Sequence, residues 1–129
     1  MEVYIQLEKL TLQEFVERIK STAKVTVLKS GHEILEISRR KNHWIHFIET
    51  NNLVCPATGK SVSYCSYDRR DYKNGQSSFH YNFYSVDDEL FSIDHKLPIS
   101  EGGSKTAKSN VQPMIMEENH KKRSQLIYL

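Results

Sequence analysis

Apolar residues recur every three or four positions after Thr11, which is the period of a helix with one buried face. The residues that follow this period are Leu12, Phe15, Val16 and Ile19. Residues 11–14 also have the spacing of a capping box, in which the side chains of Thr11 and Glu14 each bond to the backbone of the other residue. The pattern therefore predicts a helix that begins after Thr11 and ends near Lys20.

Short stretches of β-branched and aromatic residues follow this helix, and they are typical of strands. They contain Val25, Val27, Ile34, Leu35, Ile37, Ile45 and Phe47. The polar residues 29–32 predict a turn between the first two strands. A break at Asn51 and Asn52 then separates an N-terminal α+β module, residues 1–50, from the rest of the chain. This module carries no chemical motif, and we expect it to serve specificity or interaction.

The second part, residues 51–129, contains further stretches with strand character. We expect strands over residues 61–67 and 79–84, with residues 68–76 as a polar loop between them. A further strand over residues 90–93 leads into Asp94 and His95. Residues 102–109 predict a loop, residues 111–114 a returning strand, and Met116 to about Leu126 a final helix. The expected fold class is α+β, a small antiparallel β-rich domain that ends in strand, loop, strand and helix.

Composition narrows the class of protein but not its partner. The chain has 129 residues and a formal net charge of +2, which neither requires nor excludes a polyanionic partner. No apolar run is long enough for a membrane span, and residues 1–6 lack the layout of a signal peptide. The two cysteines, Cys55 and Cys65, are too few for a disulfide framework. We therefore expect a cytoplasmic protein that does not enter a membrane.

Residues 94–119 hold groups that suit the hydrolysis of a phosphodiester. That reaction needs a divalent cation to neutralise phosphate charge and a base whose pKa is near neutrality. Asp94 offers a hard oxygen ligand, and its neighbour His95 offers the base. On a strand the two side chains project to opposite faces, so one can hold a metal while the other approaches a water molecule. Asn119 on the final helix offers a second oxygen ligand.

These residues belong to a longer ordered motif. Residues 93–103 contain the pattern D-H-x-x-P-x-S-x-G-G, residues 110–113 match N-L-Q-P with Val111 for leucine, and residues 119–122 match N-x-x-K. The set resembles the HNH endonuclease family in its His-Asn-Asn variant, over roughly residues 54–125. The resemblance implies a ββα-metal motif, in which two antiparallel strands and a helix surround one metal ion.

The resemblance also implies a role for each matched residue. His95 would be the general base, while Asp94 and Asn119 would hold one Mg²⁺ or Mn²⁺. Asn110 would brace the loop and orient His95 without touching the metal. His120 is a possible substitute ligand, but helix neighbours point about 100° apart, and Asn119 is the residue that matches the motif. The implied activity is a DNA endonuclease that leaves a 5′-phosphate and a 3′-hydroxyl.

The chain departs from the family at the positions of a structural zinc site. Many members hold a zinc ion between two Cys-x-x-Cys pairs. Here Cys55 is followed by Thr58 in place of its partner, and Ile115 and Glu118 stand where the second pair would be. We expect no structural zinc there and expect packing to hold the motif together.

A different zinc site could combine His43 and His46 with Cys55 and Cys65. The spacing follows no zinc-knuckle pattern, and on a strand the two histidines would face opposite sides. Ordinary strand residues are therefore the better interpretation of His43 and His46.

Basic side chains around the motif predict the surface that contacts DNA phosphates. These residues are Lys96, Lys121, Lys122, Arg123, Arg69 and Arg70. Tyrosines close to residues 69–70 could stack on exposed bases. Residues 39–41 form another basic stretch, for which a solvated turn is the simpler interpretation.

Other interpretations of the motif stay open. The same scaffold could bind nucleic acid without cutting it, or it could cut RNA or a particular nucleic-acid structure. A chain of this size covers little duplex, so a double-strand cut would need a homodimer, whereas a monomer would nick. Restriction, homing and phage-encoded DNA processing in a bacterial host are all compatible with the motif.

Overall fold

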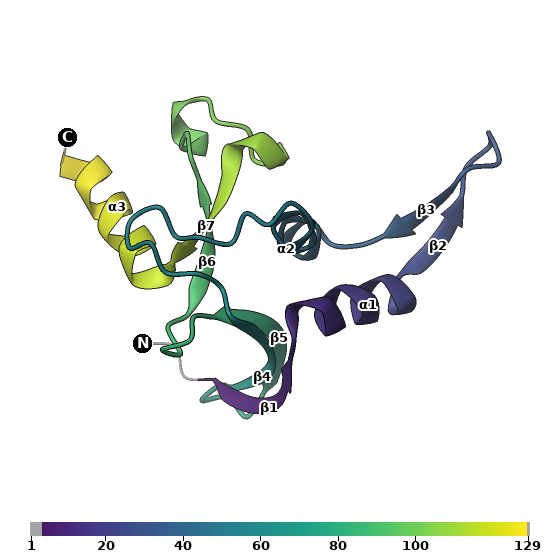
Figure 1. The fold of residues 1–129 in the computed structure, drawn as a ribbon, viewed down its shortest axis with the longest axis horizontal. Coiled ribbons are helices and arrows are strands. Elements are labelled where there is room, and N and C mark those ends of the chain that lie inside the picture. The colour runs from purple at the N-terminus through teal and green to yellow at the C-terminus, as the bar shows by residue number, and fades with distance from the viewer. Residues whose placement is uncertain (1–3, 129) are drawn as a thin grey trace.

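The computed structural model describes the backbone of residues 4–128 and the side chains of residues 4–122 (Figure 1). The described chain is a mixed α+β structure with antiparallel sheets and a C-terminal helix, as expected. Its elements are β1 (Ile5–Leu10), α1 (Leu12–Thr22), β2 (Lys24–Val27), β3 (Glu33–Glu36), α2 (Arg39–Glu49), β4 (Tyr64–Asp71), β5 (Ser77–Tyr84), β6 (Phe91–His95), β7 (Val111–Ile115) and α3 (Met116–Tyr128).

The strands pair in separate antiparallel groups. β1, β4 and β5 form a three-stranded sheet with β4 in the middle, while β2 pairs with β3 and β6 pairs with β7. In the larger sheet Cys65 of β4 lies opposite both Leu10 of β1 and Phe83 of β5. The first strand of the chain therefore belongs to the same sheet as the hairpin formed by residues 64–84.

The helix predicted after Thr11 is confirmed as α1. The Thr11 side chain accepts a hydrogen bond from the Glu14 backbone N–H at 3.0 Å, and the Glu14 carboxylate accepts one from the Thr11 N–H at 3.0 Å. This capping box satisfies backbone donors that the first helical turn leaves without partners. The apolar stripe of α1 is buried at Phe15, Val16 and Ile19.

The strand predicted around Ile45 and Phe47 is wrong, because these residues lie in α2. Two apolar residues separated by one polar residue match a strand, but the larger set does not. Trp44, Ile45, Phe47 and Ile48 recur at intervals of three and four, which places them on one face of a helix. The helix ends before Asn51, whose φ of 54° is a left-handed conformation that asparagine adopts more readily than most residues.

The loop predicted over residues 68–76 is also shorter than expected, because β4 continues to Asp71 and β5 begins at Ser77. Asp68 looked like a loop residue because it is charged, yet it is buried in the strand. Its carboxylate accepts hydrogen bonds from Asn82 Nδ2 at 2.9 Å and from the Tyr84 hydroxyl at 2.5 Å. Cross-strand partners therefore make a buried carboxylate tolerable within the sheet.

One hydrophobic core joins residues from both sides of residue 50. The rings of Trp44 in α2 and Phe83 in β5 stack with their centroids 4.0 Å apart and their planes 12° apart. Phe15 of α1 meets Phe83 edge-on at 4.9 Å. Further along the chain, Phe91 of β6 and Ile115 of β7 belong to the same cluster. The stretches 1–50 and 51–129 thus share both a sheet and a core.

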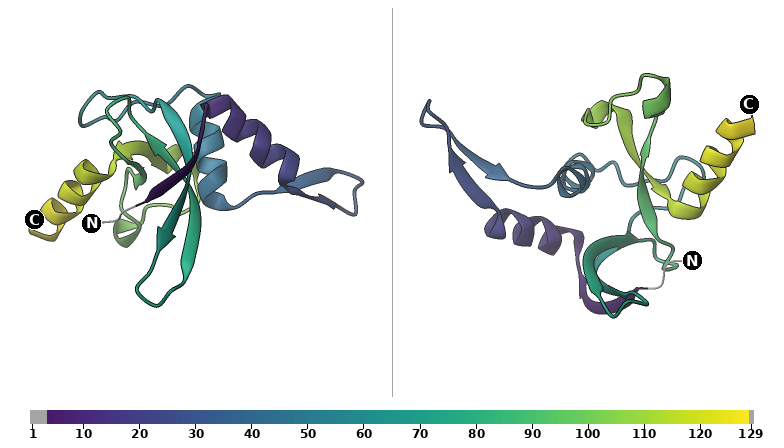
Figure 2. Two further views of the ribbon diagram at one scale, coloured as in Figure 1. Left: turned by 90° about the horizontal axis from the view of Figure 1, so that it is seen from below. Right: turned by 180° about the vertical axis from the view of Figure 1, so that it is seen from behind.

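The β2–β3 hairpin and the last helix extend outward from this core (Figures 1 and 2). The β2–β3 hairpin extends away from the rest of the molecule and carries exposed apolar side chains, among them Val27. On the opposite side, α3 packs against β6 and β7. No helix in the described part of the chain has both the length and the apolar character to cross a membrane.

Truncation of Phe83 should test how much of the fold depends on the aromatic stack. Phe83 is fully buried, so Phe83→Ala should lower the free energy of unfolding by about 3–5 kcal/mol. Phe79 lies on the same strand and is 51% exposed, so Phe79→Ala should cost less than about 1 kcal/mol. Denaturant unfolding followed by the fluorescence of Trp44, the single tryptophan, measures both values. Equal losses in the two variants would contradict this account of the core.

Candidate active site

Asp94 and His95 are the last residues of β6, and the pairing with β7 sets their surroundings. Asp94 lies opposite Gln112, and His95 lies opposite Val111. Because side chains alternate along a strand, the two residues enter different environments. Asp94 is 5% exposed, whereas His95 is half-buried.

The carboxylate of Asp94 is held by residues from β7 and α3. Its Oδ2 atom accepts hydrogen bonds from Gln112 Nε2 at 2.9 Å and from Lys122 Nζ at 2.8 Å. Lys122 Nζ also lies 3.4 Å from the backbone oxygen of His95. The sequence assigned Lys122 to DNA phosphates, and a phosphate contact stays a prediction. In this structure Lys122 ties α3 to the end of β6 and neutralises a buried charge.

Asn119 lies on the same face of α3, one turn before Lys122. It is only 2% exposed, and its Nδ2 atom donates to Ser92 Oγ at 2.9 Å and approaches the Ile93 oxygen at 3.5 Å. Both contacts use the amide nitrogen of Asn119, and the amide oxygen takes part in neither. The neighbouring His120 is exposed. The helix thus turns Asn119 toward β6 and His120 toward solvent.

Asn110 anchors the loop that connects β6 to β7. Its Nδ2 atom donates to the Leu97 oxygen at 3.0 Å and to the Ser104 oxygen at 2.9 Å, and its Oδ1 atom accepts from the Leu97 N–H at 2.9 Å. The same loop presents the Lys105 oxygen to His95 Nε2 at 3.2 Å. A carbonyl oxygen only accepts hydrogen bonds, so this contact places the ring proton of a neutral His95 on Nε2.

Gly102 and Gly103 are needed for the path of this loop. Gly102 follows a single turn of 3-10 helix (Ile99–Glu101) and has a φ of 91°, where a side chain would be strained. A Cβ on Gly103 would lie 1.9 Å from the Leu97 backbone oxygen, far inside contact distance. The Gly-Gly pair of the motif thus has a local structural cause.

The interpretation of His43 and His46 as ordinary strand residues is wrong, because both lie on the helix α2. His43 lines a pocket next to His95. The pocket has a volume of about 380 Å³ and is lined by Ser38, Arg39, Arg40, His43, Ile93, His95 and Lys105. His43 is 4% exposed, and neither of its ring nitrogens has a hydrogen-bond partner in the described structure. Burial, reinforced by the charges of His95 and Arg39, lowers the pKa of His43 and favours its neutral form. The sequence pattern predicts a strand at residues 45–47, so it does not place His43 on the face of a helix.

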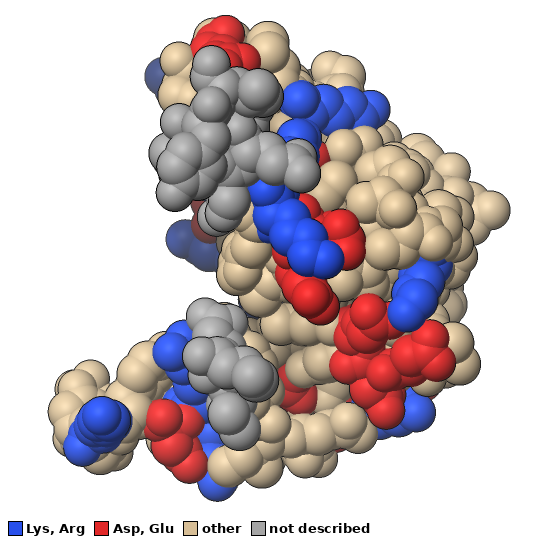
Figure 3. Space-filling view, turned by 90° about the vertical axis from the view of Figure 1, so that its left-hand side faces the viewer, with Lys and Arg blue, Asp and Glu red and all other residues tan. Residues whose placement is uncertain are grey.

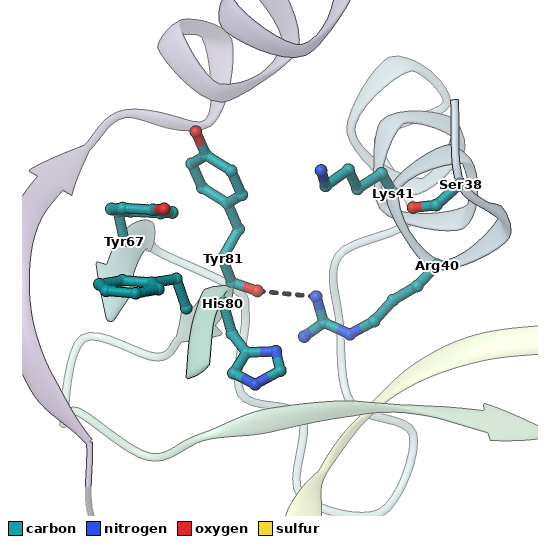
Figure 4. A pocket seen from close by; sticks show the side chains of 7 residues that line it. Ser38, Arg40, Lys41, Tyr67, His80 and Tyr81 are labelled. Atoms are coloured by element: carbon teal, nitrogen blue, oxygen red, sulfur yellow. Dashed lines mark hydrogen bonds between the residues drawn. The ribbon is translucent and has the colours of Figure 1, made fainter. Parts of the chain in front are cut away.

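A second pocket adjoins the first and shares Ser38 and Arg40 with it (Figure 4). It has a volume of about 420 Å³ and is further lined by Lys41, Tyr67, Phe79, His80 and Tyr81. Figure 4 shows aromatic rings from β4 and β5 on one side and basic side chains from α2 on the other. Arg40 Nη1 donates to the Tyr81 oxygen at 2.7 Å, which fixes the start of α2 against β5.

The basic residues predicted to contact DNA are distributed over different parts of the molecule. Arg69 and Arg70 lie within β4 rather than in a loop; Arg69 pairs with Asp71 at 3.1 Å, and Arg70 lies over the Tyr72 ring at 4.9 Å. Lys96 follows β6 and is exposed.

On α3, Lys121 pairs with Glu118 at 3.3 Å and with Glu117 at 3.8 Å. The side chain of Arg123 lies outside the described residues. Figure 3 shows that acidic and basic side chains are interspersed on the face beside the C-terminal end of the chain. Among the described residues, this face therefore does not present a continuous basic surface.

Cys55 occupies a turn beside the start of α3. Its Sγ atom accepts a hydrogen bond from the Ile115 N–H at 3.4 Å. Burial would raise the pKa of the Cys55 thiol, but hydrogen bonds from Thr58, Ile115 and Ala57 outweigh it and lower the pKa. The turn is thus attached to the β7–α3 junction by a backbone contact to sulfur and by packing. The absence of structural zinc stays a prediction.

The donor chemistry around β6 suits a hard divalent cation. Asp94 contributes a carboxylate and Asn119 an amide, and oxygen ligands of these kinds are the ones that Mg²⁺ and Mn²⁺ prefer. In the part of the chain that the structure describes, no three or more His, Cys, Asp or Glu residues converge. A metal held here would therefore need the amide oxygen and further oxygen atoms from water or substrate.

Compared with known proteins, the chain matches no family model, no curated protein and no solved structure at a significant level. The resemblance to HNH endonucleases therefore rests on the sequence motif alone.

Loss of the Asn110 side chain should loosen the loop that follows His95. Asn110→Ala removes the bonds to Leu97 and Ser104, so we expect a loss of about 1–3 kcal/mol in stability and faster amide exchange over residues 96–109. Hydrogen exchange followed by mass spectrometry measures this change, with Ser109→Ala at an exposed neighbouring position as the control. Unchanged exchange in the loop would show that Asn110 is not its anchor.

Proposed function

We propose that this protein is a metal-dependent endonuclease of the HNH type that hydrolyses phosphodiester bonds in DNA. The observation that carries the proposal is the arrangement at the end of β6. Asp94 and Asn119 are buried where β6 meets α3, while His95 is half-buried and lines a pocket that contains basic side chains. In this proposal β6, β7 and α3 form the ββα-metal motif.

His95 would act as the general base through Nδ1. Its Nε2 faces the Lys105 oxygen at 3.2 Å and carries the proton of the neutral ring, so Nδ1 has a free lone pair for a proton from water. Asn110 would be a positioning residue, because it holds the loop that carries the Lys105 oxygen. The adjacent basic side chains would attract the charged strand.

Asp94 and Asn119 are the residues that would hold the metal. A bound Mg²⁺ or Mn²⁺ would neutralise charge on the phosphate and on the leaving oxygen. The products would be a 5′-phosphate and a 3′-hydroxyl. Lys122 shares the Asp94 carboxylate, so it would remain as a second positive charge next to the phosphate.

Removal of His95 should slow cleavage strongly without unfolding the protein. We expect the native chain to relax or linearise supercoiled plasmid with Mg²⁺ or Mn²⁺ and to be inactive in EDTA. His95→Ala should lower the rate by at least about 100-fold, as general-base catalysis contributes about that much or more. His32→Ala, at an exposed turn between β2 and β3, is the matched control. Cleavage by His95→Ala at the native rate would refute the proposal.

A second candidate is a protein that binds nucleic acid on this scaffold without cutting it. The ion pair between Asp94 and Lys122 favours this candidate, because the ammonium group already supplies the buried carboxylate with a counter-charge. A protein of this kind would need no metal at Asp94. The two candidates therefore differ in what happens when Lys122 is replaced.

Lys122→Met should reveal whether Asp94 accepts a metal. The variant leaves a buried carboxylate without its cation. Breaking a fully buried ion pair lowers stability by about 3–5 kcal/mol, and we expect a smaller loss here because Lys122 is partly exposed. Under the nuclease proposal Mn²⁺ should restore thermal stability to Lys122→Met but not to the double variant that also carries Asp94→Asn. Lys121→Met is the control for loss of a charge on α3. No effect of Mn²⁺ on any variant would favour the binding protein.

A further inference from the structure

The pocket between α2, the end of β6 and the loop at Lys105 is suited to an anion. Its lining includes Arg39, Arg40 and Lys105, and no Asp or Glu among the described residues lines it. A cation would be repelled by these side chains, whereas a phosphate would be attracted. His95 lines the same pocket, so a phosphate bound there would lie close to the proposed base.

His43 provides the sign that this pocket is built to receive a ligand. Its side chain is 4% exposed, yet both ring nitrogens lack hydrogen-bond partners in the described structure. A buried polar group without a partner costs roughly 1–3 kcal/mol, so native structures rarely contain one without a cause. Both nitrogens are buried in the described structure, so a small turn of the ring toward the pocket would let its N–H donate a hydrogen bond to a phosphate oxygen.

The beginning of α2 adds to the attraction for an anion. Ser38 precedes the helix but makes no capping hydrogen bond with its side chain, and the first turn contains Arg39 and Arg40. The N-terminus of a helix is the positive end of its dipole, so basic residues there are unfavourable unless an anion is nearby. Arg39 and His43 are four residues apart and lie on one face of α2.

The adjoining pocket offers a surface for an aromatic base. The rings of Tyr67 and Phe79 stack at 6.0 Å with their planes 15° apart, and Phe79 is 51% exposed. Lys41 lies across the pocket from Tyr67 (Figure 4). Nucleobases stack on exposed aromatic rings when they are outside a duplex, because stacking between neighbouring base pairs in a duplex hides their faces.

From these observations we propose that the first turn of α2 forms a strand-binding track beside the active site. The pocket of His43 takes a phosphate, and the pocket of Phe79 takes an unpaired base of the same strand. This proposal rests on the proposed function in one respect, that the strand continues to His95. The preferred substrate is accordingly DNA with a single-stranded segment next to the site of cleavage.

Binding measured in EDTA tests the track independently of cleavage. Fluorescence anisotropy would compare a labelled single-stranded oligonucleotide with the duplex of the same sequence. Arg39→Ala should weaken binding of the single strand and reduce the slope of log affinity against log salt by about 0.7, the value expected for one phosphate contact. Lys29→Ala, an equal loss of charge in the exposed β2–β3 turn, should change neither quantity.

Phe79→Ala tests the base pocket. It should weaken single-strand binding by roughly 5- to 150-fold, which is the range for loss of one stacked base, and leave duplex binding unchanged. An equal loss of affinity for the single strand and for the duplex would contradict the proposal that this pocket takes an unpaired base. Ring nitrogen chemical shifts of His43 should move when the single strand is added, and this measurement on the native chain avoids any folding defect of a His43 variant.

The two proposals fail in different ways. If Arg39→Ala and Phe79→Ala bind the single strand like the native chain, the track is wrong even if cleavage depends on His95. If these variants lose binding but the native chain cuts nothing with any metal, the track stands and the nuclease proposal fails.

Discussion

The position of the candidate site depends on the stacking of Trp44 against Phe83. Their rings lie 4.0 Å apart and both are fully buried, so α2 is held across the sheet at a set rotation. His43 is the neighbour of Trp44, and Arg39 lies about one turn earlier on the face of His43. The rotation that buries Trp44 therefore turns His43 and Arg39 toward the pocket that His95 lines. A contact within the core thus decides which polar groups surround the end of β6.

Adjacent residues at the end of β6 experience different electrostatic environments, and this difference is what the proposed chemistry requires. Asp94 is buried, and Gln112 and Lys122 donate hydrogen bonds to its carboxylate. His95 lies on the other side, beside a pocket with basic side chains. The side chain of Asn110 fixes the loop between β6 and β7 by hydrogen bonds to the loop backbone. Because side chains alternate along β6, Asp94 and His95 face opposite sides of the strand. Packing of α3 on one side and α2 on the other gives the two residues different neighbours.

Much of the fold was predictable because its signals are local. The capping box at Thr11, the strands on both sides of the loop after His95 and the final helix follow from short-range periodicity and turn residues. The prediction failed at residues 45–47, where two apolar residues alternate like a strand but bury a helical face. It failed again at Asp68, whose charge suggests a loop. Within the sheet, Asn82 and Tyr84 donate hydrogen bonds to the Asp68 carboxylate. Such partners come from distant parts of the chain and leave no trace in a short window of sequence.

The sequence by itself determined the order of the site residues and the loop between them. Gly102 and Gly103 are required by backbone conformation and close approach, and the amide of Asn110 reaches carbonyl groups of the same loop. These constraints act within one short loop, so the identities of its residues are enough to predict them. Only the tertiary structure decided that α2 lies beside His95 and brings His43 with it. That placement arises from the burial of apolar surface between segments that are far apart in the sequence. The hydrophobic effect is not directional, so a local sequence motif does not show which segments will pack together.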